Sequence, residues 1–185
     1  MSNPWGWIVQ WRPTSFYYES YDRGDMGCTV AKCSSAITSV GNPVIWGLAA
    51  LAVLVCLIVW IIRRDVRPAV ILAGLAATWL PWFAYQERTI FTFYTIVMVP
   101  FVVLAVTYCL TLVWGRVPVR GLASPGPSTK QRFARISAAL FARRLSVGLI
   151  LVAAILAFAY FWPVYTGEVI PFSAWNDRMW NITWR

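Results

Sequence analysis

Residues 44–62, VIWGLAALAVLVCLIVWII, form an uncharged apolar run in a chain of 185 residues. An α-helix rises about 1.5 Å per residue, so about 20 apolar residues cross the roughly 30 Å hydrocarbon core of a bilayer. Three further stretches have the same uncharged character, namely residues 68–85, 90–114 and 147–165. We therefore expect four transmembrane helices at about these positions.

The composition of the whole chain also indicates a membrane protein. Apolar residues make up 59% of the chain and charged residues 12%, whereas soluble domains contain about 45–50% and about 25% of these classes. A large soluble protein can bury wholly apolar helices, but 185 residues cannot wrap four of them. The sequence predicts an all-α, multi-pass membrane protein.

The residue types exclude several kinds of chemistry. Histidine is absent, which removes a histidine general base, the usual serine or cysteine triad and histidine metal ligands. We expect neither a metal site nor a cofactor. Pumps and transporters usually place ionisable groups at membrane depth. That class is disfavoured, because all seven carboxylates lie outside the predicted spans, at Glu19, Asp22, Asp25, Glu87, Asp65, Glu168 and Asp177.

The charges orient the predicted spans, because loops rich in Lys and Arg remain in the cytoplasm. The loop after the first span holds three arginines and one aspartate, and residues 115–146 hold seven Lys or Arg and no acid. This side has the whole net charge of +9. We expect residues 1–43, the turn at Glu87 and Arg88, and the tail 166–185 to be extracytoplasmic, so that both termini face outward from the cell membrane.

Two cysteines, Cys28 and Cys33, fall on the predicted outer side, where disulfides persist. A bridge between them is favoured. Residues five apart in a straight helix are separated by about 7.5 Å along the axis, beyond the roughly 7 Å that a disulfide allows between Cα atoms. A bridged segment must therefore be a loop. A zinc site needs about four ligands and finds two here. Cys56 and Cys109 lie within spans, where we expect packing roles.

Residues 1–43 are rich in aromatic residues and too apolar for a simple disordered tail. They fit either a segment on the membrane interface, anchored by Trp5, Trp7 and Trp11, or a lid over a site at the membrane surface. Their export also requires a preceding span or a membrane partner. We therefore expect the chain to be the C-terminal part of a larger protein or to depend on a separate partner.

The basic segment 115–146 has two parts. Residues 115–130, GRVPVRGLASPGPSTK, have the composition of a linker. Residues 130–145, KQRFARISAALFARRL, predict a helix lying on the anionic inner leaflet, which accounts for the basic charge without nucleic acid. Its apolar face comprises Phe133, Ile136, Leu140 and Phe141.

Ten of the twelve tryptophans fall on or near the predicted outer side, and only Trp60 and Trp114 lie near the cytoplasmic side. An interfacial belt alone should be more even. Arg88 and Arg178 belong to the same surface, and arginine binds phosphate through a fork of donors. Such a surface suits a ligand with an anionic head and a ring-shaped body. Alternatively, the two arginines pair with their neighbours Glu87 and Asp177.

Several stretches together resemble the C-terminal membrane region of the bacterial, actinobacterial-type polyprenyl-phosphate-mannose protein O-mannosyltransferases. They are GNPVIWGL (41–48), TWLPWFAYQERTIFTFY (78–94), YFWPVYTGEVIP (160–171) and AWNDRMWNITW (174–184), with WRPTSFYYE (11–19) and the cysteine loop. The resemblance covers nearly the whole chain. It implies a GT-C fold and transfer of mannose from a polyprenyl-phosphate donor to Ser or Thr of exported proteins at the outer face.

The resemblance also indicates what this chain contributes. The catalytic acids of the family belong to the first outer loop of the N-terminal half, so we expect no catalytic residue here. The chain should complete the carrier-lipid and acceptor side of the site. The first candidates are Arg88, Phe91, Phe93 and Tyr94, and the second are Trp175, Arg178 and Trp180.

The expected partners are membrane lipids, the polyprenyl-phosphate sugar donor, an exported protein acceptor, and an N-terminal catalytic half or partner membrane protein. Nucleic acid is not among them. A noncatalytic four-span partner or assembly subunit is the main alternative, and a small transporter is the least favoured, because the spans carry no charge.

Overall fold

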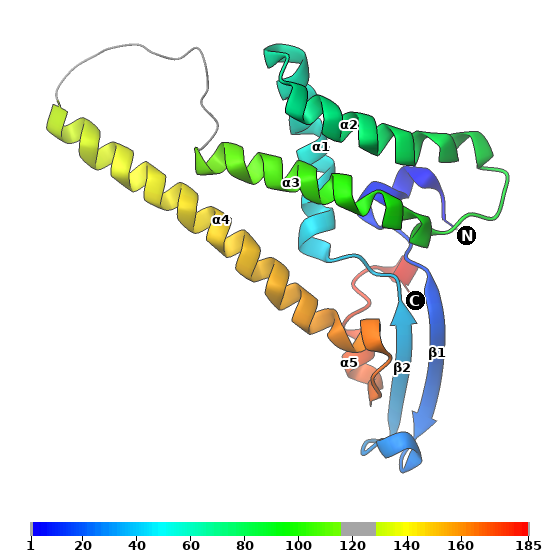
Figure 1. Ribbon diagram of the computed structural model, residues 1–185. Coiled ribbons are helices and arrows are strands. Elements are labelled where there is room, and N and C mark those ends of the chain that lie inside the picture. Colours follow the sequence, from blue (N-terminus) through cyan, green and yellow to red (C-terminus); the bar gives the residue numbers. More distant parts are fainter. Residues whose placement is uncertain (1, 116–128, 185) are drawn as a thin grey trace.

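A computed structural model describes the backbone of residues 2–115 and 129–184, and the side chains of these residues except 129–139. Almost all of the predicted linker, residues 115–130, lies outside the described residues, as do the side chains of Phe133 and Ile136. Four main helices form the membrane part: α1 (Pro43–Arg63), α2 (Val66–Trp79), α3 (Val99–Trp114) and α4 (Thr129–Thr166). Figure 1 shows α1 crossing α2 and α3 while α4 extends away from them.

Three stretches are helical, long and apolar enough to cross a membrane: Pro43–Arg63, Val66–Tyr85 and Leu140–Thr166. The helix Val99–Trp114 is shorter and also apolar. The third predicted span, 90–114, therefore begins later as an α-helix than expected, and a 3-10 helix, η4 (Thr92–Val97), precedes it. Pro100 explains the late start, because its ring would clash with a helical carbonyl four residues earlier.

Polar side chains determine where α1 and α2 begin. The Asn42 side chain accepts hydrogen bonds from the N–H groups of Val44 and Ile45, and Pro43 occupies the first turn of α1. Asp65 caps α2 in the same way by accepting from the N–H of Arg67 at 3.0 Å. Asn42 Nδ2 also donates to the carbonyl of Ala154 on α4 at 2.8 Å. The beginning of α1 is thus attached to α4.

Small side chains let α1 approach α3 closely. Ala49, Ala52 and Cys56 of α1 are buried and lie on one helix face, and the fully buried Ala105 lies on α3. Lipid is as apolar as these residues, so close van der Waals packing rather than exclusion of water favours the contact. Cys56 is buried, as expected for a packing residue, and Cys109 is partly buried.

The basic helix predicted for residues 130–145 and the fourth span are one continuous helix, α4. This corrects the expectation of a separate helix on the inner leaflet. The sequence has no glycine or proline between Lys130 and Val147, so nothing interrupts the backbone hydrogen bonds there. Leu140 and Phe141 are exposed on this helix.

A three-stranded antiparallel sheet accompanies the helices, in the order β1 (Ser15–Asp22), β2 (Lys32–Thr38) and β3 (Ile170–Pro171). The predicted mainly helical class is confirmed, but the expectation of an all-α protein omits this sheet. Cys28 and Cys33 form the disulfide that the sequence favoured, with Cα atoms 5.9 Å apart, and it closes the loop between β1 and β2. The 3-10 helix η2 (Asp25–Gly27) lies in the same loop.

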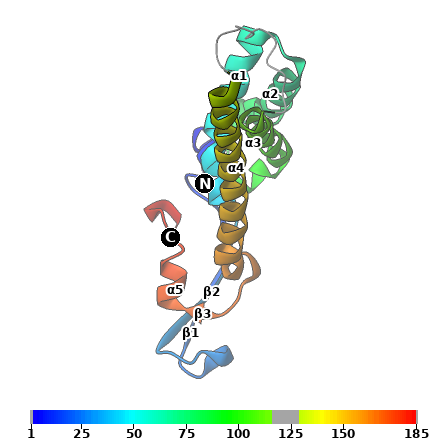
Figure 2. The same ribbon diagram turned by 90° about the vertical axis from the view of Figure 1, so that its left-hand side faces the viewer.

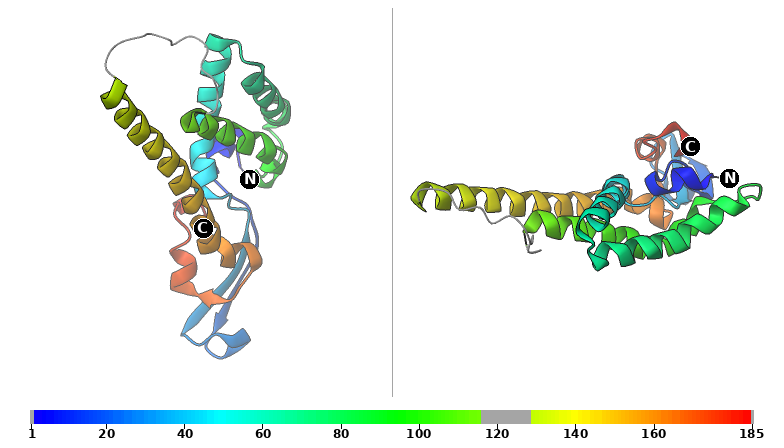
Figure 3. Two further views of the ribbon diagram at one scale, coloured as in Figure 1. Left: turned by 60° about the vertical axis from the view of Figure 1, so that its left-hand side comes forward. Right: turned by 90° about the horizontal axis from the view of Figure 1, so that it is seen from above.

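The connections between helices separate to two sides of the molecule. On one side, called here the sheet side, lie the sheet, both termini and the loop between α2 and α3 (Figures 1 and 2). On the other, called the basic side, lie the turn between α1 and α2 and the facing ends of α3 and α4 (Figure 3). Arg63, Arg64 and Arg67 lie at this turn, and Arg143 and Arg144 of α4 lie beside Gly115 and Trp114 at the end of α3. The remaining elements are η1 (Pro4–Val9), η3 (Leu80–Tyr85), α5 (Phe172–Asn176) and η5 (Ile182–Trp184), all on the sheet side.

Candidate functional site

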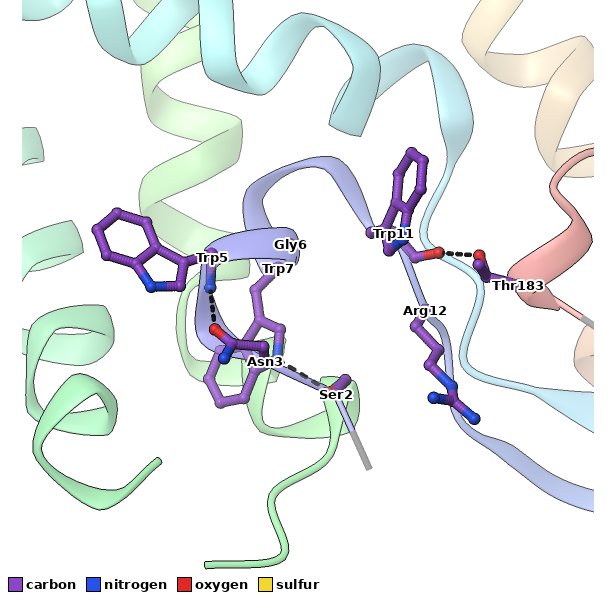
Figure 4. A pocket seen from close by; sticks show the side chains of 8 residues that line it. All are labelled: Ser2, Asn3, Trp5, Gly6, Trp7, Trp11, Arg12 and Thr183. Carbon is purple, nitrogen blue, oxygen red and sulfur yellow. Dashed lines mark hydrogen bonds between the residues drawn. The ribbon is translucent and has the colours of Figure 1, made fainter. Parts of the chain in front are cut away.

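The sheet side contains a cavity of about 540 Å³ between the N-terminal segment and the C-terminal tail. Indole rings, hydroxyl groups and one guanidinium line it (Figure 4). The lining residues are Ser2, Asn3, Trp5, Gly6, Trp7, Trp11, Arg12 and Thr183. The two ends of the chain thus build one site, which no local sequence pattern could have indicated.

Hydrogen bonds hold the N-terminal segment against the membrane helices. Asn3 caps η1 by accepting from the N–H of Trp5 at 3.1 Å, and its Nδ2 donates to Gln86 Oε1 at 3.2 Å. Trp79 Nε1 of α2 donates to the carbonyl of Pro4 at 3.0 Å. Trp7 is buried beneath the cavity, and its Nε1 donates to Ser2 Oγ at 3.0 Å. The expected interfacial anchor Trp7 is therefore a core residue, whereas Trp5 remains exposed at the rim.

Three of the predicted site residues, Phe91, Phe93 and Tyr94, lie together in an aromatic cluster beside this segment. The ring of Tyr94 stacks on Trp82 with 4.4 Å between centroids, and Phe93 lies 4.4 Å from Tyr94. Phe91 stacks on Phe93 at 5.7 Å. Rings in such offset arrangements attract one another beyond their burial, so the cluster is a preformed aromatic surface.

A second cavity, of about 230 Å³, adjoins the first. The two share Ser2, Arg12 and Thr183, and Phe91 lines the second one. The Arg12 side chain is exposed, and its guanidinium has no hydrogen bond or ion pair among the described residues. Arg12 was not among the residues predicted from sequence. The signal available was its position in WIVQWRP as a lone cation within an aromatic stretch.

The other candidate arginine of the first set, Arg88, lies in the exposed turn after η3. Its N–H donates to the carbonyl of Tyr85 at 3.1 Å. Arg88 does not form the alternative ion pair with Glu87. Within the described residues, the ion pair that is found joins Arg67 to Asp65. Arg88 lines neither of the two cavities.

Arg178 makes structural contacts with α4 and α5. Its Nε donates to the carbonyl of Tyr160 at 2.7 Å and its Nη1 to the carbonyl of Ala174 at 2.6 Å. The guanidinium also lies 4.5 Å from the centre of the Tyr160 ring. The alternative pairing with Asp177 is not formed within the described residues either. Much of the donor fork is therefore already occupied.

The remaining candidates, Trp175 and Trp180, also lie along α4 and the sheet. Trp175 packs on Tyr18 of β1 with 5.0 Å between ring centroids. Trp180 packs on Phe161 at 4.9 Å and lines a separate cavity of about 400 Å³ together with Trp46. The structure thus does not bring the second set of candidates to the cavities of Arg12.

The hairpin carries one carboxyl with a perturbed pKa. Tyr21 and Tyr17 donate hydrogen bonds to Glu19 Oε2 at 2.6 and 2.7 Å, and these bonds lower the pKa of the Glu19 carboxyl, the bond from Tyr21 most. Alternate residues of a strand share a face, which places the three side chains together. A carboxylate held in its ionised form is a weak general base. Among the described residues, no group of three or more Cys, Asp or Glu could hold a metal ion.

Comparison with known proteins gives the chain a family. Residues 1–184 match the family described as the C-terminal four TMM region of protein-O-mannosyltransferase. The polyprenol-phosphate-mannose–protein mannosyltransferase of Mycobacterium tuberculosis is 33% identical over 189 residues, and that of Mycolicibacterium smegmatis is 32% identical over 184. Each match covers 100% of this chain and 32% of the relative, so the chain spans about a third of the length of these relatives.

A solved structure has the same fold. The Saccharomyces cerevisiae protein O-mannosyltransferase Pmt1-Pmt2 complex bound to the sugar donor superimposes with a TM-score of 0.62 at 17% identity. The match covers 100% of this chain and 23% of that one. The chain therefore shares the fold of the corresponding part of that complex, and by its match over residues 1–184 it belongs to the family formed by the C-terminal four-transmembrane region of the protein O-mannosyltransferases.

Proposed function

We propose that this chain is the C-terminal part of a membrane mannosyltransferase. The whole enzyme transfers mannose from a polyprenyl-phosphate carrier to Ser or Thr hydroxyls of exported proteins. The family match supports this proposal, as do the names of the relatives, which state both the donor and a protein acceptor. The chain spans 32% of these relatives, and the catalytic acids belong to the part that it does not include.

The sheet side is extracytoplasmic in this proposal. The excess of positive charge lies on the basic side, where Arg63, Arg64, Arg67, Arg143 and Arg144 are accompanied by one acid, Asp65. Loops rich in Lys and Arg remain in the cytoplasm. The disulfide Cys28–Cys33 lies on the sheet side, and such bonds persist outside the cytoplasm. Charge and redox chemistry thus support the same orientation, with both termini outside.

The transfer reaction defines what this part of the enzyme must supply. The acceptor hydroxyl oxygen forms a bond to the anomeric carbon of mannose while the bond from that carbon to the phosphate oxygen breaks. The hydroxyl proton passes to a base, and the electron pair of the broken bond remains on the lipid phosphate. A cation near that phosphate stabilises the developing charge. Among the described residues no carboxylate lines the two cavities, so in this proposal the base comes from elsewhere in the enzyme.

The single observation that carries the proposal is the cavity on the sheet side, whose lining combines the Arg12 guanidinium, which has no partner among the described residues, with the indole rings of Trp5, Trp7 and Trp11 (Figure 4). The aromatic cluster of Phe91, Phe93 and Tyr94 adjoins it and offers flat apolar faces. Arg88 precedes this cluster in the chain and is exposed, so it can contact the donor or acceptor from the α2–α3 loop. Trp175, Arg178 and Trp180 act farther away, by supporting the tail.

Arg88 provides the first test in the full-length enzyme. Arg88→Ala should lower mannosyl transfer to an acceptor peptide much more than it lowers the amount of enzyme in the membrane. Arg23→Ala, in the exposed loop between β1 and β2, is the matched control and should change neither. Loss of membrane enzyme without loss of specific activity would instead favour a structural role for Arg88.

The noncatalytic alternative, a membrane partner or assembly subunit, is tested with the chain alone. The isolated chain should insert into membranes and transfer no mannose, whereas activity should appear only with the remaining part of the enzyme. Transfer by the isolated chain would contradict the placement of the catalytic acids. An unchanged rate of transfer in cells that lack this chain would favour the noncatalytic role.

A further inference from the structure

Arg12 lies where the two cavities of the sheet side meet, together with Ser2 and Thr183. Its guanidinium has no partner among the described residues, although arginine readily pairs with carboxylates. Neither cavity is lined by an Asp or Glu. A cation without a nearby counter-charge inside a partly apolar hollow favours an anionic ligand.

Ser2 adds a hydroxyl whose position is fixed. Its Oγ accepts a hydrogen bond from Trp7 Nε1 at 3.0 Å, which leaves the hydroxyl proton available to a ligand. The backbone N–H of Ser2 donates to the carbonyl of Ile90 at 2.8 Å, so the residue is held in place. Thr183 differs, because its hydroxyl donates to the carbonyl of Trp11. That bond attaches the tail to the N-terminal segment and keeps both walls together.

The rest of the first cavity is aromatic. Trp5 and Trp11 line it and are 70% and 57% exposed, so a ligand would cover large apolar faces that are otherwise in contact with solvent or lipid. Indole rings are favoured at the membrane interface, where one part of a ligand is apolar and the other is hydrated. The cavity therefore combines a phosphate-binding corner with an apolar wall.

We propose that Arg12 and Ser2 bind the phosphate of the polyprenyl carrier, and that Trp5 and Trp11 contact the isoprenoid units next to it. This inference rests on the proposed function and names the residues that hold its lipid donor. Arg12 donates through its planar fork to two phosphate oxygens, and Ser2 donates to a third. The same contacts stabilise the lipid phosphate as it leaves with the electron pair of the glycosidic bond.

The test measures binding of a polyprenyl phosphate without sugar to the full-length enzyme in nanodiscs. Hydrogen bonds to charged groups are each worth enough to change a dissociation constant by about tenfold or more. Arg12→Gln should therefore weaken binding at least about tenfold, and Arg12→Lys should weaken it less, because the charge remains without the fork. Ser2→Ala should have a smaller effect of the same sign. Arg23→Gln is the matched control and should bind as the unaltered enzyme does.

Two further ligands identify the source of the phosphate. Inorganic phosphate should displace polyprenyl phosphate from Arg12, but only at far higher concentration, because it lacks the isoprenoid. Trp5→Ala should reduce this difference in affinity between the two phosphates. Vesicles of phosphatidylglycerol should not compete at concentrations where polyprenyl phosphate does. Equal affinity for inorganic and polyprenyl phosphate would overturn the role of the tryptophans, and full affinity of Arg12→Gln for polyprenyl phosphate would overturn the site.

The kinetics separate this inference from the proposed function. In an active enzyme, Arg12→Gln should raise the KM for the lipid donor and leave the KM for the acceptor peptide unchanged. If polyprenyl phosphate binds through Arg12 but no mannose is transferred, the site stands and the proposed function fails. If mannose is transferred and Arg12→Gln has an unchanged donor KM, the function stands and the site fails. If Arg12→Gln does not fold, Arg12→Lys replaces it in the test. Polyprenyl phosphate should then raise the unfolding temperature of Arg12→Lys less than that of the unaltered enzyme, and an equal rise would overturn the site.

Discussion

Arg178 stabilises the tail through carbonyl groups rather than through an ion pair. Its hydrogen bond to the carbonyl of Ala174 lies within the tail, whereas its hydrogen bond to the carbonyl of Tyr160 joins the tail to α4. A hydrogen bond from a charged group contributes about 1 kcal/mol or more, here to docking of the tail. Arg178→Gln should therefore speed cleavage of the tail after Gly167 in limited proteolysis. Asp177→Asn is the control, because the Asp177 carboxylate does not pair with Arg178. Equal protection of the tail in both variants would contradict this role.

Glu19 makes the hairpin sensitive to acid. The bonds from Tyr21 and Tyr17 lower its pKa from the ordinary 4.5, so its contribution to stability is present above that pH and is lost as pH falls through the lower folded pKa. The protection factors of the β1 amides, which correct for the intrinsic pH dependence of exchange, should fall as the pH drops below 4.5 toward the lower folded pKa of Glu19. The double variant Tyr17→Phe and Tyr21→Phe should lose this acid step. An unchanged acid step in the double variant would place its cause elsewhere.

Residue roles were only partly predictable from sequence. Phe91, Phe93 and Tyr94 are neighbours along the chain, so their clustering followed from the local order of residues. The difference between Arg12 and Arg178 did not, because it depends on which carbonyls and cavities the fold places beside each guanidinium. Charge and residue type are the same in both cases, and only three-dimensional surroundings distinguish them.

The contact between α2 and α3 depends on a single glycine. A Cβ atom added at Gly74 would lie 2.0 Å from the ring of Phe101, and such overpacking costs about 1–3 kcal/mol. Gly74→Ala should therefore reduce the yield and thermal stability of the folded enzyme, and adding Phe101→Leu should recover part of both. Gly47→Ala is the matched control, since nothing lies within 4 Å of its added Cβ. Equal stability of the two alanine variants would contradict the close approach.

The cysteines of the hairpin loop differ in oxidation state from the other two cysteines of the chain. Cys28 and Cys33 are bridged, whereas Cys56 and Cys109 are free and lie within the membrane helices. Mass spectrometry after alkylation of membranes from intact cells should find the loop pair unlabelled without reductant and labelled with it. Cys56 is buried and serves as an internal control that reacts only after denaturation. Free labelling of both loop cysteines without reductant would remove the disulfide.

The elements themselves were predictable to different degrees. The apolar helices were expected because length and hydropathy are strong local signals for crossing a bilayer. The sheet was missed because β1, SFYYESYD, is exposed along nearly its whole length and lacks the alternation of apolar and polar residues that indicates a half-buried strand. The start of α3 was placed too early because apolar character continues upstream of Pro100, although helix geometry does not.

At the scale of the whole molecule, segments from both ends of the chain close the site. Thr183 donates to the carbonyl of Trp11, and Trp184 Nε1 donates to the carbonyl of Gln10 at 3.2 Å. Contacts over such sequence distances are invisible to hydropathy and spacing, which is why the cavity could not be predicted. The asymmetry of charge was readable, because it needs only the order of the spans and the positions of Lys and Arg.

The central claim is that the cavity of Arg12 opens outside the cytoplasm, where a lipid-linked sugar and an exported protein can meet. The most direct measurement is labelling of single introduced cysteines by a membrane-impermeant maleimide in spheroplasts that express the full-length enzyme. Thr89→Cys, in the exposed α2–α3 loop of the sheet side, should react in intact spheroplasts, and Arg64→Cys, on the exposed basic side, only after permeabilisation. Labelling of Arg64→Cys in intact spheroplasts, with Thr89→Cys labelled only after permeabilisation, would mean that the cavity faces the cytoplasm and would contradict the account.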